Sequence, residues 1–201
     1  MKRIETIMRT APVIPVIVIE DPADAFPLAQ ALVAGGLRVL EVTLRTPAAL
    51  EAIREMKRVP GAIVGAGTVV STQQLETVAT EGVEFIVSPG LTDRLGAAVV
   101  ESGVPWLPGT ATAGDIMRGL DLGLEHFKFF PAETSGGLKA LKALAAPFYQ
   151  AQFCPTGGIS AATAPDWLAF GPVLCVGGSW IASGSPAEIE AKARAAAALG
   201  G

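Results

Sequence analysis

The sequence alternates short apolar runs with longer amphipathic stretches, and this alternation repeats eight times along its 201 residues. The apolar runs are typical of buried strands, and the stretches between them are typical of helices. Strands that alternate with helices predict a parallel sheet, because each helix returns the chain to the end of the sheet where it began. The predicted strands span 13–19, 37–43, 62–66, 84–87, 104–107, 126–130, 152–155 and 173–176. The predicted helices span 23–34, 47–57, 71–80, 92–102, 112–120, 137–145, 161–170 and 186–199.

Eight such repeats are the number that closes a parallel barrel. We therefore predict an α/β fold of the (β/α)8 TIM-barrel type, with eight parallel strands and an N-terminal extra helix over residues 1–10. No linker or low-complexity stretch divides the chain, so residues 1–201 are expected to form a single domain. A doubly wound open sheet is the alternative that the same alternation allows.

The composition narrows the range of functions. A net charge of −4 and a pI near 5.1 argue against a nucleic-acid partner, which needs a basic surface. No apolar run reaches the roughly 18 residues of a membrane span, and residues 1–20 lack the pattern of a signal peptide. We therefore expect a cytoplasmic protein without a membrane partner.

Metal and redox sites are also not expected. The chain has one His and two cysteines, Cys154 and Cys175, which lie too far apart for a CxxC motif. This set does not make a metal-ligand cluster, so we expect no metal and no cofactor. Both cysteines are interpreted as buried, reduced and apolar in character.

One lysine stands out in the sixth predicted strand, where Lys128 lies between aromatic residues in the run HFKFF. A strand buried on both faces has no solvent side for a charged amine. Burial favours the neutral form of a lysine, which is the nucleophile that forms Schiff bases. The alternative is an edge strand with a snorkelling lysine. His126, on the same side of the strand, is interpreted as a packed residue.

One carboxylate stands out in the second predicted strand. Strand side chains alternate, so Glu41 points with Val39 and Thr43, away from Leu40 and Val42. A carboxylate that faces a core needs a partner. A structural ion pair with Arg45 is one interpretation, and an acid/base group is the other.

Glycine pairs end the last two predicted strands, in CPTGGI (154–159) and GGSW (177–180). Exposed backbone N–H groups at such turns can hold an anion, and the loops after strands seven and eight form the common phosphate site of these barrels. Tight turns that need a positive φ are the alternative. Polar or small residues also end the third, fourth and fifth strands, in GAGTV (65–69), SPG (88–90) and PGT (108–110).

The motifs EVTLRT, GAGTV, SPG, KFFPAE, CPTGGI and GGSW, in this order, closely resemble those of the bacterial 2-keto-3-deoxy-6-phosphogluconate (KDPG) and 4-hydroxy-2-oxoglutarate (KHG) aldolases. The resemblance covers about Ile14 to Trp180. It implies a class I carbon–carbon lyase of the Entner–Doudoroff pathway, which releases pyruvate from a keto-acid phosphate. A cytoplasmic (β/α)8 barrel that assembles as a homotrimer is implied as well.

The resemblance also assigns residues. It implies that Lys128 is the Schiff-base lysine and Glu41 the general acid/base. The other matched residues are implied to bind substrate: Arg45 and Thr68 the pyruvate carboxylate, Pro89 and Phe130 the apolar walls, Thr156 a polar contact, and Gly157, Gly158, Gly178 and Ser179 the phosphate.

Other functions remain open at this point. The C4 epimer of KDPG, which derives from galactonate, is an alternative substrate. Two other classes of protein are also alternatives, namely a sugar-phosphate epimerase and a trimeric scaffold whose inherited site is unused. An imine-forming lysine argues against the epimerase, and the intact Lys128 and Glu41 argue against the scaffold. Aldolases of the dihydrodipicolinate-synthase type relay protons through tyrosine, and Tyr149 lies away from the predicted strand ends.

Overall fold

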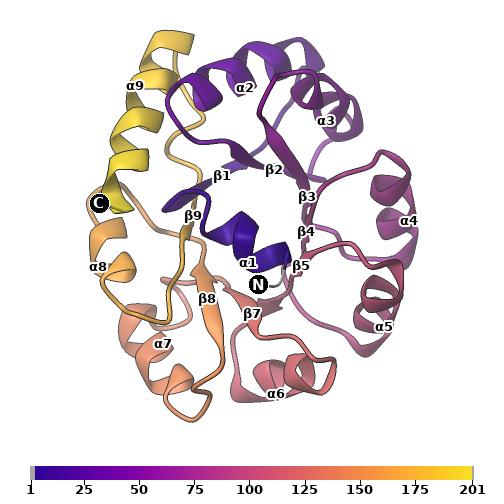
Figure 1. Cartoon of the computed structure of the whole chain (residues 1–201), viewed down its shortest axis with the longest axis vertical. Helices are drawn as coiled ribbons and strands as arrows, with labels where there is room; N and C mark the ends of the chain where they lie inside the picture. The colour runs from indigo at the N-terminus through magenta and orange to yellow at the C-terminus, as the bar shows by residue number, and fades with distance from the viewer. Residues whose placement is uncertain (1–2, 201) are drawn as a thin grey trace.

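The computed structural model describes residues 3–200, in which strands and helices alternate from end to end (Figure 1). The helices, with two short 3₁₀ turns, are α1 (Arg3–Met8), η1 (Pro22–Asp24), α2 (Ala25–Ala34), α3 (Ala49–Lys57), α4 (Thr72–Thr80), α5 (Asp93–Ser102), α6 (Ala113–Asp121), α7 (Gly137–Ala145), α8 (Ala164–Leu168), α9 (Pro186–Ala197) and η2 (Ala198–Gly200). The strands are β1 (Val13–Ile17), β2 (Val39–Thr43), β3 (Ile63–Gly67), β4 (Ile86–Val87), β5 (Trp106–Leu107), β6 (Gly109–Thr110), β7 (His126–Phe129), β8 (Gln152–Pro155) and β9 (Val176–Gly178).

The strands are parallel throughout and form a curled sheet, which confirms the predicted α/β class. Six of them pair in the order β5-β4-β3-β2-β1-β9, and the other three in the order β6-β7-β8. The first strand thus pairs with both the second and the last. In a doubly wound sheet the neighbours of the first strand are the second strand and the third or fourth, whereas here the last strand takes that second place, so the open-sheet alternative is wrong. In Figure 1 the strands curl around a common centre and helices α2 to α9 lie outside them.

The number and limits of the strands differ from the prediction. Within residues 3–200 the structure has nine strands where eight were predicted, because the predicted strand 104–107 is shortened to β5 and a separate β6 follows it. Pro108 separates the two, and proline has no N–H to donate to a strand ladder. The last predicted strand, 173–176, is displaced to Val176–Gly178, because Val173 donates its N–H back to Phe170 O (2.8 Å) in a turn.

Side chains alternate across the sheet as predicted for β2. Leu40 and Val42 lie in the core between the strands and the outer helices, whereas Val39 lies in a separate inner cluster. The two layers explain why the strands are apolar on both faces.

Helix α1 covers one end of the curled sheet, which confirms the extra helix for the described residues; residues 1–2 of that prediction lie outside them. Ile7 and Met8 of α1 pack in the inner cluster. Glu5 Oε2 lies 3.8 Å from Nε2 of His126, the first residue of β7, so the covered end is the amino end of the strands. The carboxyl end, where barrel enzymes place their chemistry, is opposite. Within residues 3–200 no helix has the length and apolar character needed to cross a membrane.

Candidate active site

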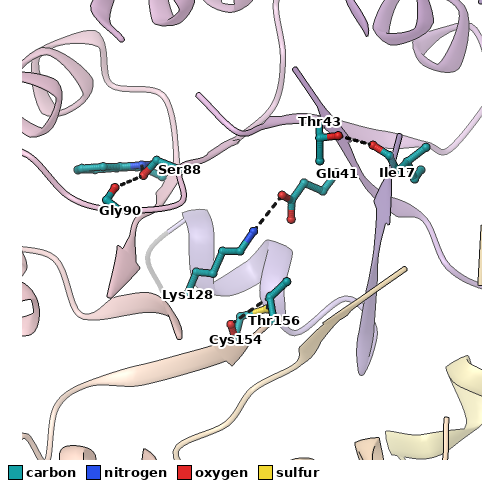
Figure 2. A network of polar contacts seen from close by, with 9 residues as sticks. Ile17, Glu41, Thr43, Ser88, Gly90, Lys128, Cys154 and Thr156 are labelled. Carbon is teal, nitrogen blue, oxygen red and sulfur yellow. Dashed lines mark hydrogen bonds and ion pairs between the residues drawn. The ribbon is translucent and has the colours of Figure 1, made fainter. Parts of the chain in front are cut away.

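Lys128 and Glu41 meet inside the curled sheet. Lys128 Nζ lies 3.2 Å from Glu41 Oε1, and their side chains are 5% and 4% exposed. Figure 2 shows the two side chains extending toward each other, Lys128 from β7 and Glu41 from β2. Two charges removed from water stabilise each other only when they are paired at close range. The partner of Glu41 is therefore Lys128, so the alternative of a structural Glu41–Arg45 pair is wrong.

The residues next to Lys128 in β7 face away from this pair, and one aromatic ring lies beside it. Phe127 and Phe129, on either side of Lys128 in β7, are buried in the outer core. The Lys128 ammonium lies 5.1 Å from the centre of the Phe130 ring, within the range of a cation–π contact. A snorkelling lysine on an edge strand is excluded, since β7 pairs with both β6 and β8.

A glycine next to Glu41 makes room for the carboxylate. A Cβ on Gly67, the last residue of β3, would lie 2.3 Å from Glu41 Oε1 and 2.7 Å from its Cγ. The register of β2 against β3 explains the contact. Glu41 pairs with Gly65 and Thr43 with Gly67, so Gly67 lies two residues beyond the partner of Glu41 and on the same face of the sheet. From the sequence, the motif GAGTV has small residues and a Thr68 that the resemblance assigns to substrate binding. The space that Gly67 leaves for the Glu41 carboxylate was not predicted. Finding it would have required knowledge of the register between β2 and β3.

Thr68 follows Gly67 in an unusual backbone conformation. Its φ is 59°, in the left-handed region, which is rare for a β-branched residue and often marks a functional site. Its side chain is half-buried at the carboxyl end of β3.

Pro89 lies in a turn that a buried serine holds in place. Ser88 Oγ accepts a hydrogen bond from the Trp106 indole Nε1 (3.1 Å). It also donates one to Gly90 O (2.6 Å), as Figure 2 shows. The turn after β4 is thereby fixed to β5. The motif SPG contains Ser88, but its contact with Trp106 was not predicted, since neither pattern nor spacing indicates that the two residues pair.

The two glycine pairs lie side by side, one in the turn after β8 and the other in β9. Thr156, directly after β8, forms a bridge with Gly177 of β9, and a Cβ on Gly177 would lie 2.2 Å from Thr156 Oγ1. Gly157 and Gly158 have φ of 105° and 82°, so the predicted need for positive φ is confirmed there. A Cβ on Gly157 would lie 3.5 Å from the Phe130 ring. The turn therefore borders the residue that contacts Lys128.

The remaining predicted site residues lie at the same end. Gly178 is buried and would place a Cβ 2.0 Å from the Trp180 ring. Ser179 is exposed in the next position, and Arg45 is exposed two residues after β2. The fold thus places Glu41 and Lys128 within β2 and β7 and brings the other matched residues to the carboxyl ends of the strands.

Cys154 lies beside the site, since it pairs with Lys128 in the ladder of β7 and β8 and its Sγ lies 3.9 Å from Thr156 Oγ1. Cys154 and Cys175 are buried and free, which confirms the prediction for both. A hydrogen bond with Cys154, followed by burial, raises the pKa of Cys175 well above its ordinary value. His126 is buried at the opposite end from the glycine turns, and Tyr149 is 93% exposed.

Comparison with known proteins places this site in a family. The family model described as "KDPG and KHG aldolase" matches residues 4–196. The chain belongs to this family. A relative from Zymomonas mobilis named 2-dehydro-3-deoxy-phosphogluconate aldolase is 59% identical over 202 residues, covering 99% of this chain and 97% of its own. A KHG/KDPG aldolase from Escherichia coli K12 is 57% identical over 178 residues, covering 88% and 84%.

Solved structures of family members are also similar. The crystal structure of the KDPG aldolase of Zymomonas mobilis ZM4 with 3-phosphoglycerate superposes with a TM-score of 0.97 at 57% identity, covering 99% of this chain and 97% of that one. The KDPG aldolase from Legionella pneumophila, solved with pyruvate captured as a covalent carbinolamine intermediate, gives a TM-score of 0.93 at 43% identity, covering 96% and 98%. The resemblance stated from the motifs is therefore confirmed.

Proposed function

We propose that this protein is a class I aldolase that cleaves KDPG to pyruvate and glyceraldehyde 3-phosphate, and that it also cleaves KHG to pyruvate and glyoxylate. The observation that carries the proposal is the buried contact of 3.2 Å between Lys128 Nζ and Glu41 Oε1. An amine and a carboxylate at this distance supply the nucleophile and the proton carrier of Schiff-base chemistry. The KHG activity is supported by the family description and by the name of the Escherichia coli relative.

The first half of the reaction forms the imine. Lys128 passes a proton to Glu41 across their contact, and the neutral amine attacks the C2 ketone of the substrate. Glu41 returns that proton to the hydroxyl group of the carbinolamine, which leaves as water, so that a protonated imine forms and the Glu41 carboxylate is ionised again. The positive nitrogen then serves as an electron sink for the bond that breaks next.

The second half breaks the C3–C4 bond. Glu41 takes the proton of the C4 hydroxyl, the electron pair of the C3–C4 bond moves into the imine, and the aldehyde leaves. Glu41 then returns a proton to C3 of the enamine, and water hydrolyses the imine to release pyruvate and free Lys128. One carboxylate can serve both proton transfers when both occur on the same side of the imine.

The other residues of the site bind the substrate. Arg45 and Thr68 hold the pyruvate carboxylate, Pro89 and Phe130 line the pyruvyl group, and Thr156 contacts the substrate oxygens. The phosphate lies against the backbone N–H groups of three glycines and the hydroxyl of a serine, namely Gly157, Gly158, Gly178 and Ser179. Support comes from the exposed glycine turn beside Phe130 and from the anion affinity of such turns.

The architecture carries a proposal of its own. The strands form one closed barrel of eight, in which β5 and β6 are two parts of a single strand interrupted at Pro108. Pairing of β1 with β9 and the bridges Phe153–Val173 and Thr156–Gly177 between the regions of β8 and β9 support closure of the barrel.

The protein assembles as a homotrimer in the cytoplasm, as the resemblance to the family implies. It has no membrane partner, and its acidic composition argues against a nucleic-acid partner. Light scattering coupled to gel filtration tests the trimer.

An assay of pyruvate release tests the activity. Pyruvate formed from KDPG, from its C4 epimer derived from galactonate, and from KHG is measured with lactate dehydrogenase and NADH. The proposal predicts turnover of both KDPG and KHG, with and without a chelator. Absence of pyruvate from KDPG would contradict it, and faster turnover of the C4 epimer would reassign the substrate.

A further inference from the structure

Glu133 touches the glycine turn after β8 at two points and helix α8 at a third, although it is an exposed residue. Its backbone N–H donates to Gly157 O (3.1 Å). Its Cγ and Cβ lie 2.6 and 2.7 Å from the position that a Cβ on Gly158 would occupy. Its carboxylate Oε1 accepts a hydrogen bond from Trp167 Nε1 (3.2 Å). Glu133 therefore joins both glycines of the turn to helix α8.

Trp167 is a firm anchor for this contact. Its side chain is 2% exposed, and its ring centre lies 6.3 Å from that of Phe129 in β7. An indole has one N–H to donate, and in Trp167 that donor is directed at Glu133. The position of the Glu133 side chain is thus set by the core and not by solvent.

The glycine turn needs such a restraint. Gly157 and Gly158 are both in conformations that few other residues adopt, and glycine has the most backbone freedom to lose on ordering. A turn that presents N–H groups to an anion binds it best when the turn is already fixed. A direct contact of Glu133 with the anion is unfavourable, because a carboxylate repels a phosphate. Holding the turn is the role that remains for it.

We propose that Glu133 is a positioning residue that fixes the Gly157–Gly158 turn through its hydrogen bond to Trp167, and that it thereby sets the preference for phosphorylated over unphosphorylated substrates. This inference rests on the proposed function, which places the substrate phosphate at this turn. It predicts an effect confined to phosphate binding, because Glu133 has no contact with Lys128 or Glu41 among those found in residues 3–200.

The test compares Glu133→Ala with Glu133→Gln. Loss of one hydrogen bond of this kind should raise KM for KDPG and the Kd of glycerol 3-phosphate, measured by calorimetry, about five- to tenfold. The kcat for KDPG and the KM for KHG should stay unchanged. Glu133→Gln keeps an acceptor for Trp167 without the charge and should restore wild-type values. Trp167→Phe should reproduce the alanine effect and add little to it in the double variant.

Several results would overturn the inference. One is a Glu133→Ala protein whose KM rises equally for KDPG and KHG, and another is unchanged binding of glycerol 3-phosphate. A glutamine variant as impaired as the alanine variant would assign the effect to charge. The calorimetric measurement needs no turnover, so it decides the inference even if wild-type protein fails to cleave KDPG, which would refute the proposed function alone.

Discussion

The substitution Gly67→Ala should displace Glu41 without touching Lys128. The added Cβ would lie 2.3 Å from Glu41 Oε1, 2.7 Å from Cγ and 2.9 Å from Cδ, whereas ordinary contacts of a Cβ begin at 3.4 Å. The carboxylate must therefore move by about 1 Å. Lys128 Nζ is the group that it leaves, since the two now lie 3.2 Å apart.

The expected loss follows from this displacement. A shift of about 1 Å in a reacting group can cost about 10²-fold in rate, which lies at the lower end of the 10²–10⁴-fold worth of a general acid/base. We expect kcat/KM for KDPG to fall about 10²-fold. The crowded interior should also lose about 1–3 kcal/mol of stability, as overpacked cores do.

The assay pairs pyruvate release with thermal unfolding followed by circular dichroism, so that activity is compared between folded proteins. Gly171→Ala is the matched control, because Gly171 is exposed and nothing lies within 4 Å of its added Cβ. In a Glu41→Ala background the clash is gone, and Gly67→Ala should cost little more. Near wild-type activity of Gly67→Ala, or an equal loss in the Glu41→Ala background, would refute the reasoning.

Three further predictions concern single groups. Glu41→Gln should lower kcat about 10²–10⁴-fold yet still form a reducible adduct with pyruvate, and loss of the adduct in mass spectra would contradict its assigned role. Cys154 and Cys175 should resist a thiol reagent at neutral pH and react after unfolding, because both are buried and the pKa of Cys175 is raised; rapid labelling of the native protein would be the contrary result. Partial burial raises the pKa of Asp115, but hydrogen bonds from the N–H groups of Ala111 and Thr112 and from the Thr112 hydroxyl outweigh it and leave that pKa lowered. Asp115→Ala should therefore lower the free energy of unfolding by its full amount at pH values above 3.8, the unfolded-state pKa of Asp115. This loss should disappear as the pH falls through the lower folded-state pKa. Denaturant titrations at neutral and acidic pH can check it.

Much of the fold could be predicted because the pattern is local. Apolar runs separated by helical stretches are read from neighbouring residues, and strand alternation placed Glu41 on the inner side with Val39. Strand limits were less predictable, since they depend on ladder partners: β5 ends before Pro108, and Val173 turns back to Phe170.

The site was predictable where one residue contradicts its surroundings. Lys128 among phenylalanines and Glu41 among aliphatic residues are conspicuous in the sequence. Their contact was not predictable, because 87 positions separate them. Gly67 and Ser88 carry no such signal, since their importance arises from neighbours that only the folded chain supplies.

The most direct test of the account is reductive trapping on Lys128. Protein incubated with pyruvate is reduced with borohydride, digested and mapped by mass spectrometry, with Lys128→Arg as the control. The account predicts a reduced pyruvate adduct on the peptide that contains Lys128, and none in the control. No adduct in the wild-type protein, or an adduct on another lysine that persists in the control, would contradict it.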